Sequence, residues 1–438
     1  MRENVSKMTE IHKKYLTQPV SSSVSESVDV KMDIGSSWKG SSSENKNFIK
    51  IWPFVWLVLL LLSPSLYVIQ KYLGAQGLVF YVLFVPVTVF FVLRNFLPFF
   101  TTRMSEKQAF LLTLMFLACL VVIFFIVFPK ANVPLPGQGS DSDDGLNLAV
   151  QELLNLRYPY NVRAYLGNPI SEFPGAIMLS MPFLMMGNSA YQNIFWIILF
   201  CMFLKLYLKT WRLVFPLMLL LFVLSPEVVR QLVTGGPILA NEIFVMLSMY
   251  LIVSQLSGTH DSTMAKIGSA VFLGIAMSSR LNFVLVGPLL LSCLVQNSGW
   301  KQTVKYLLIS LLVWSVVTLP FYFYSSGSFT PLIAQADKAS HSALPYSVIL
   351  LPLVGGMISV ILAMRRMGPD CEALFGYSAL VQGLLVVAVV ILSNLSKDKI
   401  DLFDTRYGIM FLFLGCVPCW RVLTREWQHT EHIGGPEN

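Results

Sequence analysis

Residues 109–128 read AFLLTLMFLACLVVIFFIVF, twenty consecutive positions without one charged side chain. A helix of twenty residues, at a rise of about 1.5 Å each, is about 30 Å long and matches the hydrocarbon core of a bilayer. We therefore expect this segment to cross a membrane. Further apolar runs lie on both sides of it, at about 51–70, 78–98, 189–208, 212–226, 238–256, 267–280, 282–296, 303–324, 346–364, 374–393 and 406–420.

The composition of the whole chain is that of a membrane protein. Of 438 residues, 55% are hydrophobic and 13% are charged, against roughly 25% charged in soluble globular proteins. These values, with a mean hydropathy of +0.66, exclude the disordered, collagen-like and disulfide-rich secreted classes. They predict an all-α polytopic membrane protein with about 12 transmembrane helices. The net charge of +7 comes from residues between the apolar runs, so we interpret it as a topology signal and expect no nucleic-acid partner.

The distribution of basic residues predicts which loops face the cytoplasm. Residues 175–187 form an apolar run of only 13 residues, which is short for a span and suits a helix in the membrane interface. If this run does not cross, both termini are cytoplasmic, and the short inner segments hold thirteen Lys and Arg against seven in the short outer loops. That excess fits the positive-inside rule. We expect an integral protein of a bacterial inner membrane.

This topology divides the chain into five parts. Residues 1–50 are serine-rich and mixed in charge, a composition that predicts a disordered cytoplasmic tail. Three N-terminal transmembrane helices are expected in 51–128, and a large extracytoplasmic loop with interfacial helices in 129–188. A nine-helix region is expected in 189–422, followed by a cytoplasmic C-terminal tail in 423–438.

The outer loop carries three carboxylates in four positions: Asp141, Asp143 and Asp144. Neighbouring like charges raise one another's pKa unless a cation or hydrogen bonds relieve them, which makes the cluster a candidate general base. A divalent cation held by Asp141 and Asp143 is a second possibility, because carboxylate oxygens bind such ions. The third is structural, since Asp is a favoured N-cap residue and residues 146–156 have the apolar spacing of a helix.

The segments that follow these acids come in a characteristic order. After the amphipathic segment 146–156 come Pro159-Tyr160, the turn Phe173-Pro174, and an apolar run that ends at Gly187. In this order the chain resembles the GT-C superfamily, the polytopic glycosyltransferases that use polyprenyl-phosphate sugars and that include mannosyl-, arabinosyl- and aminoarabinosyltransferases. Two features depart from the family pattern. The loop follows the third membrane helix instead of the first, and the family's frequent paired proline is reduced to Phe173-Pro174.

The resemblance implies roles for several residues of this chain. An acidic residue of the loop is the catalytic base in the family, and Asp144 fits that position best, with Asp143 as the alternate. The family's basic phosphate ligand at the outer end of a glycine-containing helix corresponds to Arg280. A late Arg-Tyr before a membrane helix, here Arg406 and Tyr407, is similar to a lipid-phosphate ligand. Ordinary anchoring of these side chains at the membrane interface is the alternative.

Two further residues belong to the expected substrate-binding set. Tyr160 lies in the Pro-Tyr element of the loop, and Glu242 lies a few residues inside an apolar run. A carboxylate in such a run usually faces a partner or a wet cavity. Glu242 is thus expected to orient an acceptor hydroxyl or to pair with Arg280 or Arg230; a neutral, structural role is the alternative.

The expected activity is an inverting transfer of a sugar from a polyprenyl-phosphate or diphosphate donor to a lipid, glycan or protein acceptor on the extracytoplasmic face. No cofactor is required by this expectation, although a divalent cation remains possible. A transporter or lipid flippase is one alternative, and a polysaccharide polymerase or ligase is another. A third is an assembly subunit that keeps the architecture without turnover.

Overall fold

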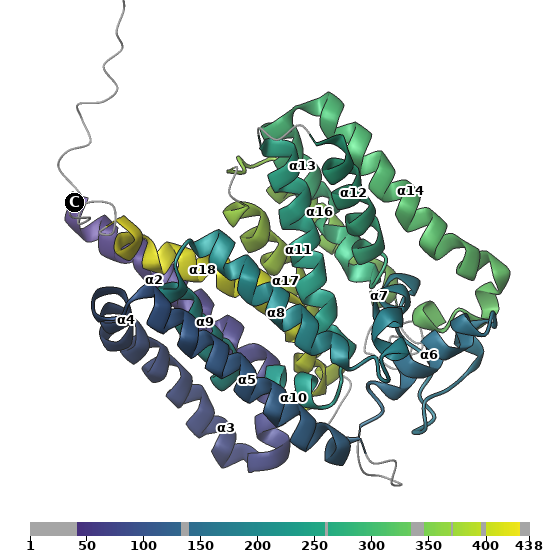
Figure 1. Ribbon diagram of the computed structural model, residues 1–438, viewed down its shortest axis with the longest axis horizontal. Coiled ribbons are helices and arrows are strands. Elements are labelled where there is room, and N and C mark those ends of the chain that lie inside the picture. The colour runs from purple at the N-terminus through teal and green to yellow at the C-terminus, as the bar shows by residue number, and fades with distance from the viewer. Residues whose placement is uncertain are drawn as a thin grey trace, which may run out of the picture. The chain divides into compact units, whose positions relative to one another are not determined.

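The structure is a computed structural model that describes residues 42–132, 140–258, 262–333, 346–368, 371–395 and 400–429. Residues 49–438 form one compact unit, and its described residues contain helices and no strand. Figure 1 shows these helices. Their bounds are α2 Ser42–Leu62, η1 Ser63–Ser65, α3 Leu66–Phe91, η2 Val92–Phe96, α4 Leu97–Arg103, α5 Glu106–Ala131, α6 Asp144–Leu154, η3 Pro159–Asn161, α7 Pro174–Met185, α8 Tyr191–Leu208, α9 Trp211–Val223, α10 Pro226–Val233, α11 Pro237–Ser257, α12 Thr263–Met277, η4 Leu281–Val286, α13 Gly287–Ser298, α14 Trp300–Tyr324, η5 Ser326–Ser328, α16 Ser347–Ala363, α17 Glu372–Leu395, η6 Phe403–Gly408 and α18 Ile409–His429.

The all-α, polytopic character expected from the sequence is confirmed for the described residues. Eight of their helical segments are long and apolar enough to cross a membrane, and the count is nine if the bent pair α9 and α10 is one span. Each of the expected apolar runs overlaps a helix. Shorter apolar helices are α7, α12 and a part of α16.

The first apolar segment, Ile51–Arg103, is helical along its length, but the chain reverses its direction within it. Gly74 has φ 68° and ψ −169°, a conformation outside the helical region. The hydroxyl of Tyr81 donates to the carbonyl oxygens of Leu61 at 3.2 Å and Leu224 at 2.6 Å. A straight helix would separate Tyr81 from Leu61 by about 30 Å. The chain therefore folds back at Gly74 and forms an antiparallel helical hairpin.

Some helix bounds differ from those expected. Residues 1–41 of the expected tail lie outside the described residues, and α2 begins at Ser42. The run expected at 212–226 ends at Val223, and the chain bends by 80° into α10, because Pro226 cannot continue α9 and instead starts a new helix. The last helix passes the expected boundary at 423 and ends at His429.

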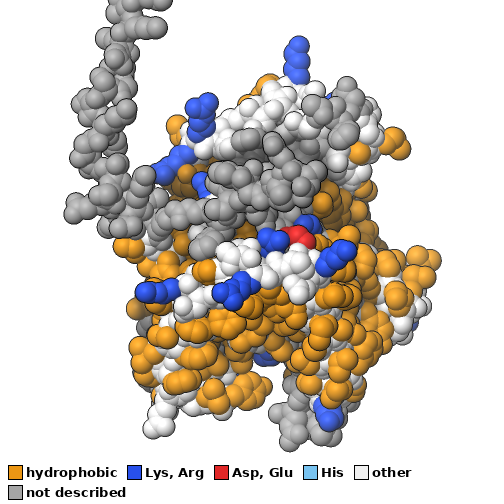
Figure 2. All heavy atoms as spheres, turned by 60° about the vertical axis from the view of Figure 1, so that its left-hand side comes forward, with side chains coloured by type: hydrophobic (Ala, Val, Ile, Leu, Met, Phe, Trp, Pro, Cys, Tyr) orange, Lys and Arg blue, Asp and Glu red, His pale blue; other side chains and the backbone are white. Residues whose placement is uncertain are grey.

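One end of the helices gathers basic residues. Lys205 Nζ lies 3.2 Å from Glu106 Oε2, and an Arg212 guanidinium nitrogen donates to the carbonyl oxygen of Thr101 at 3.0 Å. Arg421 stacks on the ring of Tyr207 at 4.7 Å. We call this end the Glu106 end. Figure 2 shows a wide hydrophobic surface together with many more basic than acidic side chains.

At the opposite end of the helices, which we call the Asp143 end, α6, η3 and α7 form a small module with its own core. Leu146, Tyr160, Phe173 and Phe329 are buried together in it. Tyr158 ties the module to the end of α14, because its hydroxyl donates to the carbonyl oxygen of Phe321 at 2.9 Å. Figure 1 shows α6 and α7 together beside the end of α14. We call α6, η3 and α7 the outer module.

Candidate functional site

Asp143 is buried where the outer module meets the long helices. Only 5% of its surface is exposed, and its Oδ2 accepts hydrogen bonds from Asn147 Nδ2 at 3.3 Å and Asn188 Nδ2 at 3.2 Å. It precedes α6 in the N-cap position, yet its side chain makes no capping hydrogen bond. The structural interpretation of Asp143 as a capping side chain is therefore wrong; it binds two amides instead.

A glycine allows this close packing around Asp143. Gly235 lies in the turn between α10 and α11 with φ +66°, and a Cβ built there would lie 2.8 Å from the Cβ of Asp143 and 2.7 Å from the Cβ of Ala190. A side chain at Gly235 would thus be strained and would clash. Burial raises the pKa of Asp143, the hydrogen bond from Asn188 lowers it in part, and the neighbouring charge of Asp144 raises it further.

Asp144 and Asp141 hold a tight turn of the outer module. Asp144 Oδ2 accepts the backbone N–H of Tyr165 at 2.8 Å, and Asp141 Oδ2 accepts Asn168 Nδ2 at 2.8 Å. The turn closes through Gly167, which has φ +85° and donates its N–H to the carbonyl oxygen of residue 164 at 2.8 Å. Asp144 is half-buried, and only its Oδ2 takes a hydrogen bond from a described residue.

The Tyr165 hydroxyl, which lies near Asp141, Asp143 and Asp144, has a raised pKa. Burial comes first among the causes, and the charges of Asp141, Asp144 and Asp143 add to it in that order; all four raise the pKa of the Tyr165 hydroxyl. Each carboxylate accepts hydrogen bonds from different residues. Within the described ranges, no group of three or more Asp, Glu, His or Cys side chains is placed to hold a metal ion. The expected pair Asp141 and Asp143 thus has no third such ligand beside it among the described residues.

Tyr160 contacts the protein core and not open space. It is 3% exposed, and its hydroxyl donates to the carbonyl oxygen of Glu172 at 3.1 Å. Burial raises its pKa well above the usual value, and the charges of Tyr158 and Glu172 act in the same direction. In the described structure, the residue expected to bind substrate thus fixes the turn that leads into α7.

A backbone contact places the outer module on the end of α12. The N–H of Gly175 donates to the carbonyl oxygen of Ser278 at 3.2 Å, two residues before Arg280. A Cβ at Gly175 would lie 2.2 Å from the carbonyl oxygen of Ile275. Glycine is therefore required for this approach, and the contact joins the module that carries Asp144 to the segment that carries Arg280.

Arg280 and Glu242 lie near the start of α11 but do not pair with each other. With the Asn241 amide oriented to satisfy its neighbours, its oxygen accepts Arg280 Nε at 3.2 Å and its nitrogen donates to Pro237 at 3.1 Å. Glu242 is fully buried, and its Oε1 accepts the backbone N–H of Leu414 at 3.4 Å. Its Oε2 has no hydrogen-bond partner among the described residues.

The other cation suggested for Glu242 has a different partner. Arg230 Nε donates to Glu227 Oε2 at 2.6 Å, and the carboxylate of Glu227 is completely buried. The expectation that Glu242 pairs with Arg280 or Arg230 is therefore wrong for the described contacts. Arg280 instead donates a hydrogen bond to Asn241, the residue before Glu242 in the sequence.

Arg406 has surroundings unlike those of Arg280. Its guanidinium carbon lies 3.7 Å from the ring centre of Phe403 and 5.1 Å from that of Tyr407. One terminal nitrogen donates to the Tyr407 hydroxyl at 3.3 Å, while Nε is buried and has no partner among the described residues. The two expected phosphate ligands thus share no contacting residue among the described ones.

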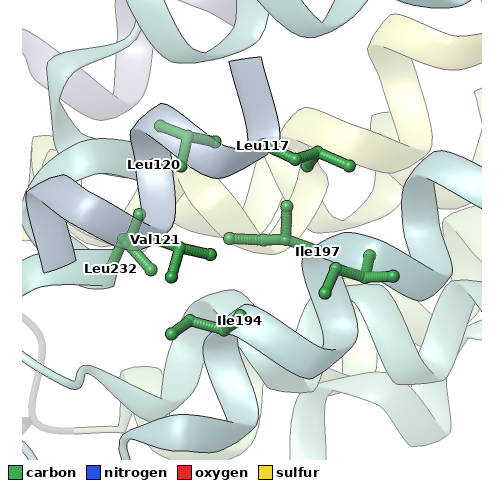
Figure 3. A pocket seen from close by; sticks show the side chains of 7 residues that line it. Leu117, Leu120, Val121, Ile194, Ile197 and Leu232 are labelled. Atoms are coloured by element: carbon green, nitrogen blue, oxygen red, sulfur yellow. The ribbon is translucent and has the colours of Figure 1, made fainter. Parts of the chain in front are cut away.

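A small apolar pocket of about 10 Å³ lies between α5, α8 and α10. Figure 3 shows its aliphatic lining, which includes Leu120 from α5, Ile197 from α8 and Leu232 from α10. None of the carboxylates described above lines it. Its wall nevertheless reaches the Asp143 end, since Leu232 lies three residues before Gly235. The pocket is hydrophobic and offers no reacting group.

Sequence reasoning missed several residues that shape the site: Asn188, Gly235, Glu172 and Ser278. Their contacts join positions that are far apart in the chain, so no local pattern marks them. The glycine pair at 235–236 is the one local signal from which a close approach could have been predicted. Comparison of the chain with protein-family models, with curated proteins and with solved structures finds no match.

Proposed function

We propose that the protein is a membrane glycosyltransferase that moves a sugar from a polyprenyl-phosphate or diphosphate donor to an acceptor with inversion. The observation that carries the proposal is the contact of Gly175 with Ser278, which joins the acidic outer module to the helix end that presents Arg280. A carboxylate and a cation on adjoining elements are what such a transfer needs, namely a base for the acceptor and a positive charge for the leaving phosphate.

The proposed topology has twelve spans. It is obtained from the eight long segments by counting α9 with α10 as one span, dividing Ile51–Arg103 at Gly74, and adding the short apolar helices α12 and α16. In it, α7 lies in the interface and the outer module is extracytoplasmic. The basic residues at the Glu106 end are then cytoplasmic, as the positive-inside rule requires.

In the proposed reaction, Asp144 takes the proton of the acceptor hydroxyl. Its Oδ2 is bound by Tyr165, so Oδ1 is the oxygen available for this proton. The acceptor oxygen then forms a bond to the anomeric carbon from the face opposite the phosphate. The bond between that carbon and the phosphate oxygen breaks, and both electrons leave with the phosphate. Arg280 and Arg406 stabilise the negative charge that develops there.

The test is a transfer assay with purified protein in vesicles and a polyprenyl-phosphate sugar. Asp144→Asn is expected to slow transfer by about 10²- to 10⁴-fold, which is the rate factor that a positioned general base usually contributes. Glu152→Gln is the matched control, because Glu152 also lies on α6 but pairs with the exposed Arg157 at 2.7 Å. An Asp144→Asn protein that transfers sugar at the wild-type rate would remove the assignment.

One observation favours a second function, movement of a lipid-linked substrate across the membrane. Glu242 is fully buried in α11 and one of its oxygens has no described partner, and such intramembrane carboxylates mark transport pathways in many proteins. Vesicles that hold donor on one side and acceptor on the other distinguish the two functions. Passage of the labelled donor that is lost in Glu242→Gln and retained in Asp144→Asn would favour transport.

A further inference from the structure

An open apolar groove runs along the first half of α14. Its volume is about 290 Å³, which is close to the lower end of the range for small-molecule sites, about 300–1,000 Å³. Trp300, Leu308 and Leu311 in its wall are each more than half exposed, so the groove faces outward from the helices. We call it the α14 groove. Its lining consists of apolar side chains from α13 and α14, namely Leu291, Trp300, Val304, Leu307, Leu308 and Leu311.

The length of the α14 groove matches one leaflet of a bilayer. α14 is an apolar helix of 25 residues and is long enough to cross a membrane. The groove begins at its first residue, Trp300, and reaches Leu311, which is a rise of about 16 Å along the helix. The hydrocarbon core is about 30 Å thick, so one leaflet contributes about 15 Å. An extended lipid chain that enters beside Trp300 would therefore end where the groove ends.

Two lysines lie beside the entrance of the groove. Lys301 and Lys305 are exposed and are four residues apart, which puts their Cβ atoms about 6 Å apart on one side of α14. Each precedes a lining residue by three positions, Val304 and Leu308 respectively, so both lysines flank the groove. Helical side chains lean toward the N-terminus of their helix, which here is the end where the groove begins.

The charge of these lysines is not balanced within α13 and α14. The two helices contain no Asp or Glu, and neither lysine forms an ion pair with another residue that the structure describes. Lys305 Nζ instead lies 5.2 Å from the centre of the Tyr306 ring. Lysines at a helix end can also serve as a topology signal alone. A groove of one-leaflet length beside them is a feature that such a signal does not require.

The charged entrance lies at the end of α14 that is remote from the outer module. Tyr158, which precedes η3, donates to the carbonyl oxygen of Phe321, and Phe321 follows Trp300 by 21 residues, or about 32 Å along the helix. Figure 1 shows α14 leading away from α6 and α7. In the proposed topology the entrance is cytoplasmic. Anionic lipids give the cytoplasmic leaflet a negative surface, and basic sites between membrane helices on that side bind their headgroups.

We infer that the α14 groove binds an anionic phospholipid of the leaflet that meets this end of the protein. One acyl chain lies against the leucines of the groove, and the headgroup phosphate accepts charge-assisted hydrogen bonds from Lys301 and Lys305. Trp300 lies at the level of the headgroup, where tryptophan is enriched. This lipid site is separate from the proposed sugar-transfer site, because no residue assigned to that site lines the groove. The proposed topology enters only in naming the leaflet.

The test measures lipid binding to the delipidated full chain in detergent by native mass spectrometry. The probes are phosphatidylglycerol, phosphatidylcholine with the same acyl chains, and inorganic phosphate. Lys301→Gln/Lys305→Gln should bind phosphatidylglycerol about 10- to 30-fold more weakly than the wild type, as the loss of two lysines near an anionic headgroup implies. Its binding of phosphatidylcholine should be unchanged. Arg103→Gln/Lys107→Gln is the matched control, because it removes two exposed positive charges from α4 and α5 and leaves the α14 groove intact.

A second pair of variants tests the groove separately from the charge. Leu308→Trp places a larger side chain in the groove and keeps both lysines. It should weaken phosphatidylglycerol binding by about tenfold, the effect of roughly two methylene groups of the lipid that are no longer buried. Leu312→Trp is the matched control, because Leu312 is 64% exposed on the same helix, against 58% for Leu308, and does not line the groove.

Four outcomes would overturn the inference. The first is wild-type affinity for phosphatidylglycerol in Lys301→Gln/Lys305→Gln or in Leu308→Trp. The second is an equal loss of affinity in the charge control, or phosphatidylcholine that binds the wild type as tightly as phosphatidylglycerol. The third is displacement of the lipid by inorganic phosphate at the same concentration, because the lysines would then hold a free anion. The fourth is a wild-type dimer that Leu308→Trp dissociates, because the groove would then hold a second copy of the chain.

Discussion

The two ends of α5 hold carboxylates in opposite surroundings. Glu106, at the first residue of the helix, accepts hydrogen bonds from Trp211 N at 3.0 Å and Lys205 Nζ at 3.2 Å, and it also binds Thr210. Asp143, beyond the last residue, accepts two side-chain amides and no cation among the described residues. The Glu106 carboxylate is thus neutralised by its neighbours and fastens helices together. Burial of Asp143 raises its pKa, and carboxylates with a perturbed pKa are frequent at functional sites.

The largest effect is expected where the Asp143 end depends on backbone contact. Gly175→Val would place side-chain atoms against the carbonyl oxygen of Ile275, which cannot move away, and should lower the free energy of unfolding by about 3 kcal/mol or more. Gly268→Val is the control, since a Cβ there meets nothing within 4 Å. Apparent Tm in detergent and the yield of monodisperse protein measure the loss. A Gly175→Val protein as stable as Gly268→Val would show that α7 does not rest on α12.

An intermediate effect is expected at the Glu106 end. Glu106→Ala removes the acceptor shared by Lys205, Thr210 and Trp211 and leaves two cations close together. Because the Glu106 side chain is 40% exposed, solvent screens the charges, and we expect a loss of about 1–2 kcal/mol. Thermal unfolding of Glu106→Ala measures this loss, and Lys107→Ala, a change at an exposed neighbouring residue, is the control. No difference between the two variants would mean that Glu106 does not fasten the helices.

The smallest effect concerns the pH dependence of stability. The folded pKa of Asp143 is raised above its ordinary value of 3.8, so the folded protein holds this proton more tightly than the unfolded chain. The contribution of Asp143 to the free energy of unfolding is greatest at low pH. It falls as the pH rises from the ordinary pKa of Asp143 to its pKa in the folded protein, and it is constant above that pKa. Asp143→Asn should remove this fall, and should change stability by about 1 kcal/mol or less near neutral pH. Apparent Tm of both proteins from about pH 4 to pH 7 tests it. Parallel curves would contradict the prediction.

The sequence predicted the helices well because hydrophobic runs are local. Every expected run overlaps a helix, and the short apolar run at 175–187 is the separate helix α7. The contacts of the candidate site were not predictable in the same way. They join residues 45 to 338 positions apart: Asp143 contacts Asn188, Gly175 contacts Ser278, and Tyr67 contacts Thr405. Such pairs follow from how helices pack, which the hydropathy of one segment does not encode.

The pairing of Tyr67 with Thr405 has a consequence for biosynthesis. The Tyr67 N–H donates to the Thr405 hydroxyl at 3.3 Å across 338 residues, so this contact forms only when the segment that precedes α18 has been made. At about 5–20 residues per second, the wait is roughly half a minute. During that interval the hairpin can dock on α10 through Ser65 and Glu227, but it lacks its contact with η6. A ribosome that stops before residue 403 would release a chain whose first and last segments never close the bundle.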